Sequence, residues 1–197
     1  MAPEQRVEQR IGAVLPDITL PSVTAPDHTW RLHEAAARGR GAVLVFWSSV
    51  CSHCSRYDEY LNTFTARHPE LAFAAIASRQ GESADDVRAA LATRQLVFPT
   101  LYDDGSAVAH QLFTQQTPRV FLVDADSQLV YRGAIDNFKY PEDSEYEAYL
   151  EPAVESLLAG RPVARPDTPS FGCAISSVYY TIPKPLNVIS TRSLKKI

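Results

Sequence analysis

The chain has 197 residues, of which 45% are hydrophobic and 21% are charged, and its formal net charge is -4. These values are ordinary for a globular protein that builds a core of its own. They exclude the strongly basic surface of a nucleic-acid-binding protein, and no apolar run approaches the ~20 residues of a membrane-spanning helix. We therefore expect neither a nucleic-acid partner nor a membrane span.

The first residues, MAPEQRVEQRIGAV, are polar and charged, and they lack the apolar stretch of a secretory signal peptide. This predicts a cytoplasmic protein. The alternative is an exported or periplasmic protein from which a signal peptide was removed. Three cysteines are too few for a disulfide scaffold, so any cysteine chemistry would be local.

The first half of the chain alternates between strand and helix patterns. After a Pro-Asp turn within 11–20, residues 21–30 have the composition of turn and loop. Residues 42–48, AVLVFWS, form an unbroken apolar run, which predicts a strand buried on both faces. One helix is then predicted from about Cys51 to the His68-Pro69 pair, because apolar residues recur at helical spacing: Cys54, Tyr57, Leu61 and Phe64.

A second strand pattern, LAFAAIA at 71–77, is followed by Ser83 and Asp86, which resemble a capping box and predict a helix. Further along, FPTLYDDG predicts a short strand and a turn, with a short helix after it. RVFLVD and QLVYRG flank ADS and fit a hairpin.

A last helix is predicted from about Tyr146 to Leu158, with a kink or a start at Pro152 and a C-cap at Gly160. This order of elements indicates an α/β sandwich with a mixed sheet. We therefore assign residues 1–160 to one domain. Residues 161–197 begin with a proline-rich stretch and predict a tail that wraps the domain or is partly disordered.

Cys51 and Cys54 are the strongest candidates for reactive residues, because they lie between a predicted strand and a predicted helix. Unpaired N–H groups at a helix start favour a thiolate at the first cysteine, and the second lies close enough to resolve a mixed disulfide. The imidazole of His53 would add stabilisation, or be a plain exposed polar residue. We expect Cys51 to be the more exposed of the two cysteines.

Two other interpretations of the cysteine pair stay open at this point. A structural zinc site usually needs four ligands, whereas Cys173 is the only other cysteine and the remaining histidines are scattered at positions 28, 33, 68 and 110. The prediction is therefore that no metal is bound. The cysteines could also be ordinary core residues, since free cysteine is often buried.

Four stretches, IGAVLPDITLPS, AVLVFWSSVCSHC, FPTLYDDG and TPRVFLVDADSQLVYRG, resemble redoxins of the thioredoxin superfamily over roughly residues 11–160. The likeness is to thiol-disulfide oxidoreductases and to thiol peroxidases of the alkyl hydroperoxide reductase type. It implies a thioredoxin-like fold: a central mixed β-sheet flanked by helices, here with a C-terminal extension. It also implies that Cys51 is the nucleophile and Cys54 the resolving cysteine.

The resemblance gives further residues a role at the site. It implies a cis peptide bond between Thr117 and Pro118, in a loop that faces the cysteines and whose Thr117 backbone pairs with a substrate strand. Trp47 resembles the aromatic residue packed under such a site, and it could equally be plain core. The Gly172-Cys173 pair is similar to one in a redoxin subgroup. An extended tail could bring Cys173 back to the active-site face, so our hypothesis is that it is a third redox thiol, and the alternative is a small residue that anchors the tail.

The chain also departs from these families. Val45 stands where thioredoxins have a buried aspartate, and Tyr57 where exported oxidoreductases often have a glutamate. The peroxidases have a proline and a threonine where this chain has Leu44 and Ser48. Because the buried carboxylate is missing, we favour a protein that oxidises dithiols or exchanges disulfides slowly. Because the proline is missing, we rank the peroxidase hypothesis second.

The main hypothesis is a thiol-disulfide oxidoreductase that cycles Cys51 and Cys54 without a cofactor. Its partners would be protein or small-molecule thiols and disulfides, together with an unidentified reductase or oxidase. The alternatives are a thiol-dependent peroxidase that uses Cys51, and a non-catalytic interaction module with the same fold. We also expect His53 to raise the reduction potential of the pair.

Overall fold

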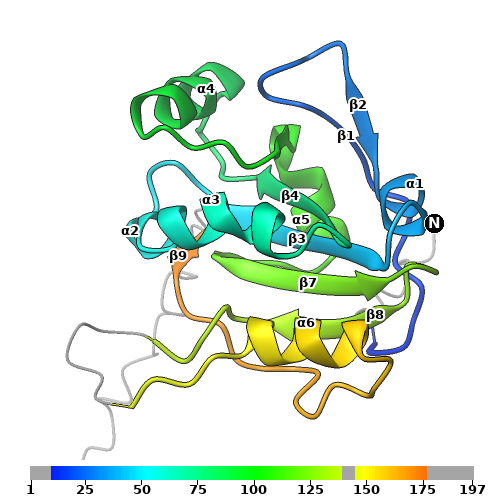
Figure 1. Cartoon of the computed structure of the whole chain (residues 1–197). Coiled ribbons are helices and arrows are strands. Elements are labelled where there is room, and N and C mark those ends of the chain that lie inside the picture. The colour runs from blue at the N-terminus through cyan, green and yellow to red at the C-terminus, as the bar shows by residue number, and fades with distance from the viewer. Residues whose placement is uncertain (1–9, 139–144, 177–197) are drawn as a thin grey trace, which may run out of the picture.

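A central sheet of five strands, in the order β5-β4-β3-β7-β8, organises the computed structural model, which describes residues 10–138 and 145–176 (Figure 1). Strand β3 is parallel to β4, and β4 to β5, whereas β7 is antiparallel to both β3 and β8. The sheet is therefore mixed. Its strands are β3 (Gly41–Trp47), β4 (Ala72–Ala77), β5 (Thr100–Tyr102), β7 (Arg119–Asp124) and β8 (Leu129–Gly133).

Strand β3 lies in the middle of this sheet, and all seven of its residues are buried. Its side chains alternate between two separate clusters of core residues, because successive residues of a strand point to opposite faces. Val43, Val45 and Trp47 enter one cluster, and Leu44 and Phe46 enter the other. This two-sided burial explains why the strand is apolar without alternation.

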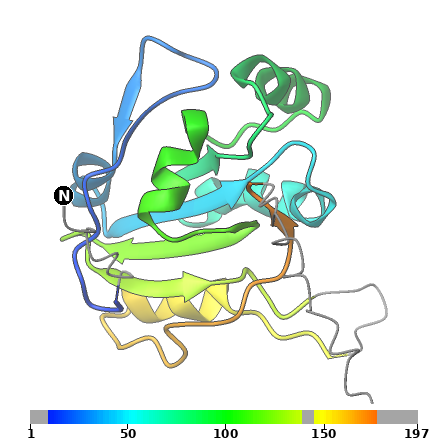
Figure 2. The ribbon, with the colours of Figure 1, turned by 180° about the vertical axis from the view of Figure 1, so that it is seen from behind.

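Helices cover both faces of the sheet (Figures 1 and 2). Residues from four of them enter the cluster that holds Trp47: α2 (Ser52–Ser55), α3 (Asp58–Arg67), α4 (Ala84–Thr93) and α6 (Leu150–Leu158). The opposite cluster takes residues from two: α1 (Leu32–Ala37) and α5 (Ala107–Gln111), the latter following a turn of 3-10 helix, η1 (Asp104–Ser106). The predicted fold class, an α/β thioredoxin-like fold with a mixed sheet, is confirmed.

Several elements depart from the sequence-based expectations. Residues 21–30, expected as turn and loop, contribute to a small antiparallel pair, β1 (Thr19–Pro21) and β2 (Thr29–Arg31), and α1 follows it directly. The two strands have three residues each, which is too short for an alternation pattern to be recognised.

The predicted single helix from Cys51 to His68 is wrong, because the chain breaks between α2 and α3. The N–H of Tyr57 donates to the carbonyl of Cys54, three residues back, so the turn is tighter than α-helical. Its hydroxyl donates to Asp136 at 2.5 Å. A partner 79 residues away therefore holds the residue at the break, and no local pattern encodes such a contact.

The chain after α6 runs back across the domain in extended form. Gly160 ends the helix with a positive φ of 66°. The backbone of Arg132, in edge strand β8, then exchanges hydrogen bonds with Pro166 and Thr168 at 2.8 and 3.0 Å. Figures 1 and 2 both place the end of this segment, β9 (Cys173–Ala174), beside α2.

Strand β9 pairs antiparallel with β6 (Gln116–Thr117), in the loop just before β7. The polar N-terminal residues 1–9, and the part of the predicted tail beyond residue 176, lie outside the described residues. Within the described ranges, no helix has the length and apolar character needed to span a bilayer.

Candidate active site

The two cysteines lie where β3 turns into α2. Cys51 precedes the first residue of α2 and has an extended backbone, with φ -87° and ψ 114°. Its carbonyl accepts from the N–H groups of Cys54 and Ser55 at 3.0 and 3.1 Å, so Cys54 follows one turn later. Both thiols are free. The sequence-predicted placement at a strand-to-helix junction is thus the observed one.

Hydrogen bonds make the two sulfurs chemically unequal. The Cys54 thiol donates to the Cys51 sulfur, and with contributions from Cys173 and Thr117 this lowers the pKa of Cys51 to about 4 despite burial. Burial, together with the negative charge on Cys51, raises the pKa of Cys54 well above its ordinary value. The reduced pair therefore consists of a Cys51 thiolate and a Cys54 thiol, as a nucleophile and a resolving group require.

The peptide bond between Thr117 and Pro118 is cis, as the resemblance implies. The loop faces the cysteines, since the Sγ of Cys51 lies 3.3 Å from the carbonyl oxygen of Thr117. The Thr117 hydroxyl is buried and has no hydrogen-bond partner among the described residues. Its proximity to the Cys51 sulfur contributes to the low pKa of Cys51.

Cys51 is expected to be the more exposed of the two cysteines, but the structure buries both: Cys51 is 1% exposed and Cys54 0% exposed. The reason is the C-terminal segment, whose strand β9 places Cys173 directly opposite Thr117. The Cys173 thiol and its backbone N–H lie close enough to the Cys51 sulfur to help lower the pKa of Cys51. The third cysteine thus lies at the site, and it closes the face from which Cys51 would otherwise be reached.

Trp47 is fully buried in the core cluster that also contains both cysteines. Its ring meets that of Phe98 edge-on, at 5.8 Å between centroids, and the guanidinium of Arg94 lies 5.2 Å from its ring centroid. It supports the end of β3 from which the chain turns to Cys51.

His53 is half-buried on α2, and its ring packs edge-on against Phe171, with 5.0 Å between centroids. Its backbone N–H lies close enough to the Cys173 sulfur to lower the pKa of that thiol, against a larger opposing effect of burial. The residue therefore contacts the C-terminal segment from both its side chain and its backbone. Its effect on the reduction potential stays a prediction.

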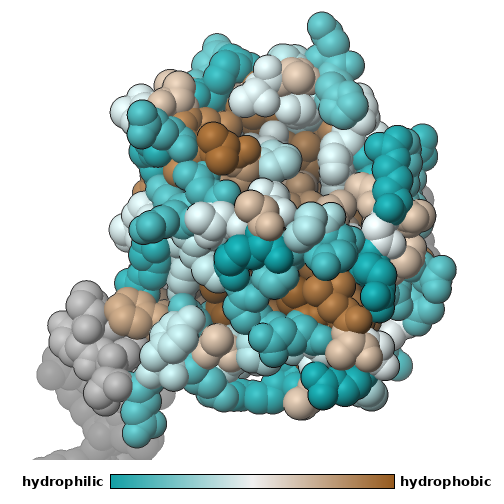
Figure 3. Space-filling view, viewed as in Figure 1, coloured by the Kyte–Doolittle hydropathy of each residue, from teal (hydrophilic) through white to brown (hydrophobic). Residues whose placement is uncertain are grey.

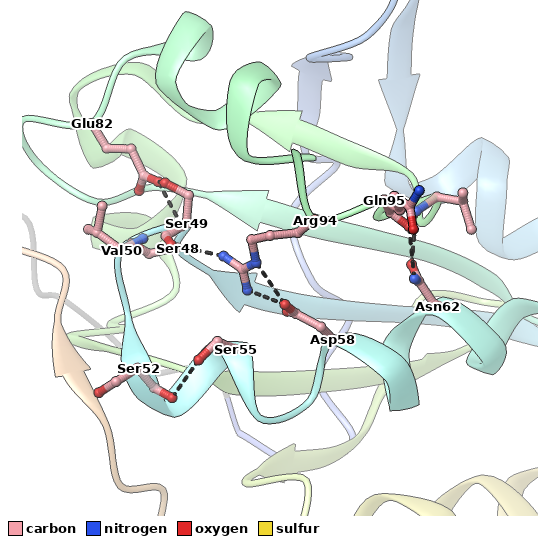
Figure 4. A network of polar contacts seen from close by, with 11 residues as sticks. Ser48, Ser49, Val50, Ser52, Ser55, Asp58, Asn62, Glu82, Arg94 and Gln95 are labelled. Carbon is pink, nitrogen blue, oxygen red and sulfur yellow. Dashed lines mark hydrogen bonds and ion pairs between the residues drawn. The ribbon is translucent and has the colours of Figure 1, made fainter. Parts of the chain in front are cut away.

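Sequence reasoning missed a group of charged residues that holds the turn before Cys51 (Figure 4). Glu82 is 7% exposed and accepts hydrogen bonds from the N–H of Ser49, at 2.7 Å, and from its hydroxyl. Arg94 donates to the Ser49 carbonyl at 2.9 Å and forms an ion pair with Asp58. In the sequence these residues belong to ordinary charged stretches, so nothing local marks them.

A pocket of about 570 Å³ opens beside the site, between the helix break, the cis-proline loop and the C-terminal segment. Tyr57, Pro118 and Phe171 contribute to its wall, together with the buried carboxyl of Asp136. Burial, and then the bond to Asp136, raise the pKa of Tyr57. Across residues 10–138 and 145–176, no group of three or more His, Cys, Asp or Glu side chains could hold a metal ion.

Comparison with known proteins agrees with this geometry. The family model described as Redoxin matches residues 10–150. A hypothetical protein from Sinorhizobium meliloti 1021 is 27% identical, with a TM-score of 0.76, and the match covers 86% of this chain and 95% of that one. No curated protein matches.

Two further solved structures are similar. An uncharacterized conserved protein from Geobacillus kaustophilus is 25% identical with a TM-score of 0.76, over 85% of this chain and 92% of that chain. A putative thiol:disulfide interchange protein DsbE from Chlorobium tepidum is 21% identical with a TM-score of 0.62, over 77% of this chain and 99% of that chain.

Proposed function

The chain belongs to the Redoxin family and has a thioredoxin-like redox role, and from this premise we propose that it is a thiol-disulfide oxidoreductase that cycles Cys51 and Cys54 between dithiol and disulfide. The observation that carries the proposal is geometric: Cys51 and Cys54 lie one turn apart at the start of α2, and the Cys51 sulfur lies 3.3 Å from the carbonyl of the cis-proline loop. The pKa of Cys51 is lowered and that of Cys54 is raised, which agrees with this arrangement. Neighbouring thiols with one ionised and one protonated sulfur suit sequential attack and resolution.

The reaction would proceed in two exchanges. The Cys51 thiolate attacks one sulfur of a substrate disulfide, so that a mixed disulfide forms and the other substrate sulfur leaves as a thiolate. Cys54 then gives up its proton and attacks Cys51, which releases the second substrate thiolate. The protein ends with a Cys51–Cys54 disulfide and the substrate with two thiols. A dithiol reductant reverses the change and completes the cycle.

The test is insulin reduction driven by dithiothreitol, with turbidity as the readout. Cys51→Ser should abolish the catalysed rate, and Cys54→Ser should accumulate a mixed disulfide on Cys51, detected by mass spectrometry. Ser55→Ala is the matched control, because this exposed hydroxyl donates only to the Ser52 carbonyl among the contacts of α2. An unchanged rate in Cys51→Ser would overturn the proposal.

A peroxidase that uses Cys51 is the second candidate named from the sequence. Leu44 and Ser48 stand where such enzymes have proline and threonine, and Ser48 is fully buried, with its hydroxyl accepting from the N–H of Val50 at 3.4 Å. Consumption of hydrogen peroxide with the same variants separates the two activities. Insulin reduction without peroxide consumption supports the oxidoreductase.

A further inference from the structure

The strongest unexplained feature of the molecule is that all three cysteines lie close together, beside Thr117. Cys173 lies opposite Thr117 in the antiparallel pair of β9 and β6, and the Cys51 sulfur lies 3.3 Å from the carbonyl of that same Thr117. Cys173 lies close enough to the Cys51 sulfur to contribute to the low pKa of Cys51. A cluster of three nucleophilic sulfurs is more than a catalytic pair needs.

The segment that carries Cys173 is held on both sides of it. Before it, the Ser170 hydroxyl accepts from the side chains of Gln116 and Arg119 at 2.7 and 2.8 Å. After it, the N–H of Ile175 donates to Gln115 at 2.9 Å, and the carbonyl of Ile175 accepts from Gln80 at 2.8 Å. The Ile175 side chain is 1% exposed. These contacts fix Cys173 in register with the cis-proline loop.

Gly172 permits this close approach. A Cβ atom on it would lie 1.9 Å from the carbonyl oxygen of Thr117 and 2.7 Å from its carbonyl carbon. Both are backbone atoms, which have little room to yield, so any other residue would push the segment away from the loop. The Gly172-Cys173 pair therefore combines the residue that allows contact with the residue that supplies a thiol.

We propose that Cys173 is a third exchange thiol, and that residues 170–175 act as a built-in substrate strand which accepts the disulfide from Cys51 and Cys54. The inference rests on the proposed oxidoreductase function and extends it. The segment pairs with the Thr117 backbone, the same backbone that the resemblance to redoxins assigns to an external substrate strand. A substrate must therefore displace it, or exchange with the disulfide that it carries.

The transfer of the disulfide from Cys51 and Cys54 to Cys51 and Cys173 needs no external oxidant. The Cys173 thiol loses its proton, and its thiolate attacks the Cys51 sulfur of the Cys51–Cys54 disulfide. The Cys51–Cys54 bond breaks as the Cys51–Cys173 bond forms. Cys54 leaves as a thiolate and takes up a proton, so the number of disulfides and the number of protons are unchanged. The reverse exchange returns the oxidised pair.

The test uses full-length Cys54→Ser, in which Cys51 cannot pair with Cys54, and oxidised glutathione as the oxidant. Glutathione first forms a mixed disulfide with Cys51, and Cys173 then displaces it as reduced glutathione. We expect peptide mapping to find a Cys51–Cys173 bridge in most of the protein. Cys54→Ala repeats the experiment in case the buried serine hydroxyl impairs folding, and Cys54→Ser with Cys173→Ser should stop at the glutathione adduct.

Gly172→Ala in the Cys54→Ser background tests the docking rather than the thiol. It should lower the yield of the bridge at least tenfold, with Cys173 still present. Gly160→Ala is the matched control. Unlike Gly172, Gly160 has a positive φ, of 66°, and nothing lies within 4 Å of its Cβ position, so the substitution perturbs the backbone away from the site.

A Cys51–glutathione adduct that persists beside an unreacted Cys173 would overturn the inference. That result would leave the oxidoreductase proposal intact, because Cys51 and Cys54 could still form their own disulfide and reduce insulin. Loss of the oxidoreductase proposal has a different signature, namely an unchanged insulin rate in Cys51→Ser. The two failures are thus distinguishable.

Discussion

At the scale of single residues, the reactivity of Cys51 depends on direct neighbours more than on a helix. Helix α2 has only four residues, so its dipole is small. The low pKa of Cys51 is instead caused mainly by the neighbouring Cys54 thiol, with smaller contributions from Cys173 and Thr117. Such short contacts suffice to offset the burial of the sulfur.

The pH dependence of Cys51 alkylation tests this account. With a pKa of about 4, Cys51 is almost fully ionised above pH 5, and the thiolate fraction is lost only as the pH falls through that value. Its alkylation rate by iodoacetamide should therefore change less than about threefold between pH 5 and 8, where an ordinary thiol of pKa ~8.5 gains several hundred-fold.

The measurement is mass spectrometry of the Cys51 peptide from the reduced protein. Cys173→Ala provides the comparison, since loss of the Cys173 thiol without a replacement donor should raise the pKa of Cys51 and shift the profile to higher pH. A wild-type rate that climbs tenfold with each pH unit would contradict the assignment of Cys51 as the thiolate.

His53 gives a second prediction at this scale. His53→Pro should make the Cys51–Cys54 disulfide harder to reduce, with a shift of about -30 mV for each tenfold change in equilibrium. Proline is tolerated in the first turn of a helix, but it removes both the imidazole that packs on Phe171 and the N–H beside the Cys173 sulfur.

Redox titration against glutathione measures the effect, and His53→Ala separates its causes. The alanine variant keeps the N–H, so equal shifts in both variants assign the effect to the imidazole, and a shift only in the proline variant assigns it to the backbone. Unchanged potentials in both would leave His53 as a polar residue that packs on the C-terminal segment.

At the scale of elements, the turn between β3 and α2 depends on side chains from elsewhere in the chain. Glu82 follows β4, and Arg94 follows α4, yet both bind the backbone of Ser49 (Figure 4). The turn that carries Cys51 is therefore fixed by two charged groups that approach it from neighbouring elements.

Glu82→Ala should destabilise the protein by about 2 kcal/mol, because the N–H and hydroxyl of Ser49 would both lose a charged acceptor. Urea unfolding measures the loss. Asp85→Ala is the control, since its carboxyl is exposed and pairs only with Arg88. A cost for Glu82→Ala below 0.5 kcal/mol on this scale would mean that water replaces the carboxylate without loss.

Elements with strong local signals could be predicted from the sequence. The apolar runs of β3 and β4 and the capping box at Ser83 are complete within short stretches, and the structure contains all three. The small pair β1 and β2 and the helix break at Tyr57 depend on partners distant in sequence, so local patterns do not reveal them.

The same distinction applies to the site. The spacing of Cys51 and Cys54 is local and could be recognised, whereas the near-complete burial of Cys51 could not, because β9 lies beside it. Glu82 was missed because a single glutamate in a charged stretch has no pattern. Sequence reasoning does not identify the site residues that are brought together by strand register or by ion pairs.

At the scale of the whole molecule, the C-terminal segment connects the edge of the sheet with the active site. It runs from α6 along β8 to α2 (Figure 2), and it is anchored midway by Thr168, which is 3% exposed. Hydrophilic side chains cover most of the face in Figure 3, and apolar ones show only in small areas. Because the segment pairs with the loop that faces Cys51, and Cys51 is 1% exposed, we expect the segment to limit access to Cys51.

Thr168→Val tests this connection, because it keeps the shape of the side chain and removes its hydroxyl. That hydroxyl lies 2.8 Å from the Tyr131 hydroxyl and accepts from the N–H of Ala134 at 3.2 Å. A buried N–H left without a partner costs about 1–3 kcal/mol. The substitution weakens the attachment of the C-terminal segment to the domain. The variant should therefore release that segment and expose Cys51, although Cys51 itself is unchanged.

We expect Thr168→Val to lose about 1–3 kcal/mol in urea unfolding, and the Cys51 peptide of the reduced protein to be alkylated at least tenfold faster at pH 7. Thr63→Val is the control, because this exposed hydroxyl donates only to carbonyls of its own helix. If stability falls while the alkylation rate of Cys51 stays at the wild-type value, the segment protects Cys51 without depending on its anchor at Thr168. Access to the site would then be controlled locally, by the contacts of residues 170–175 alone.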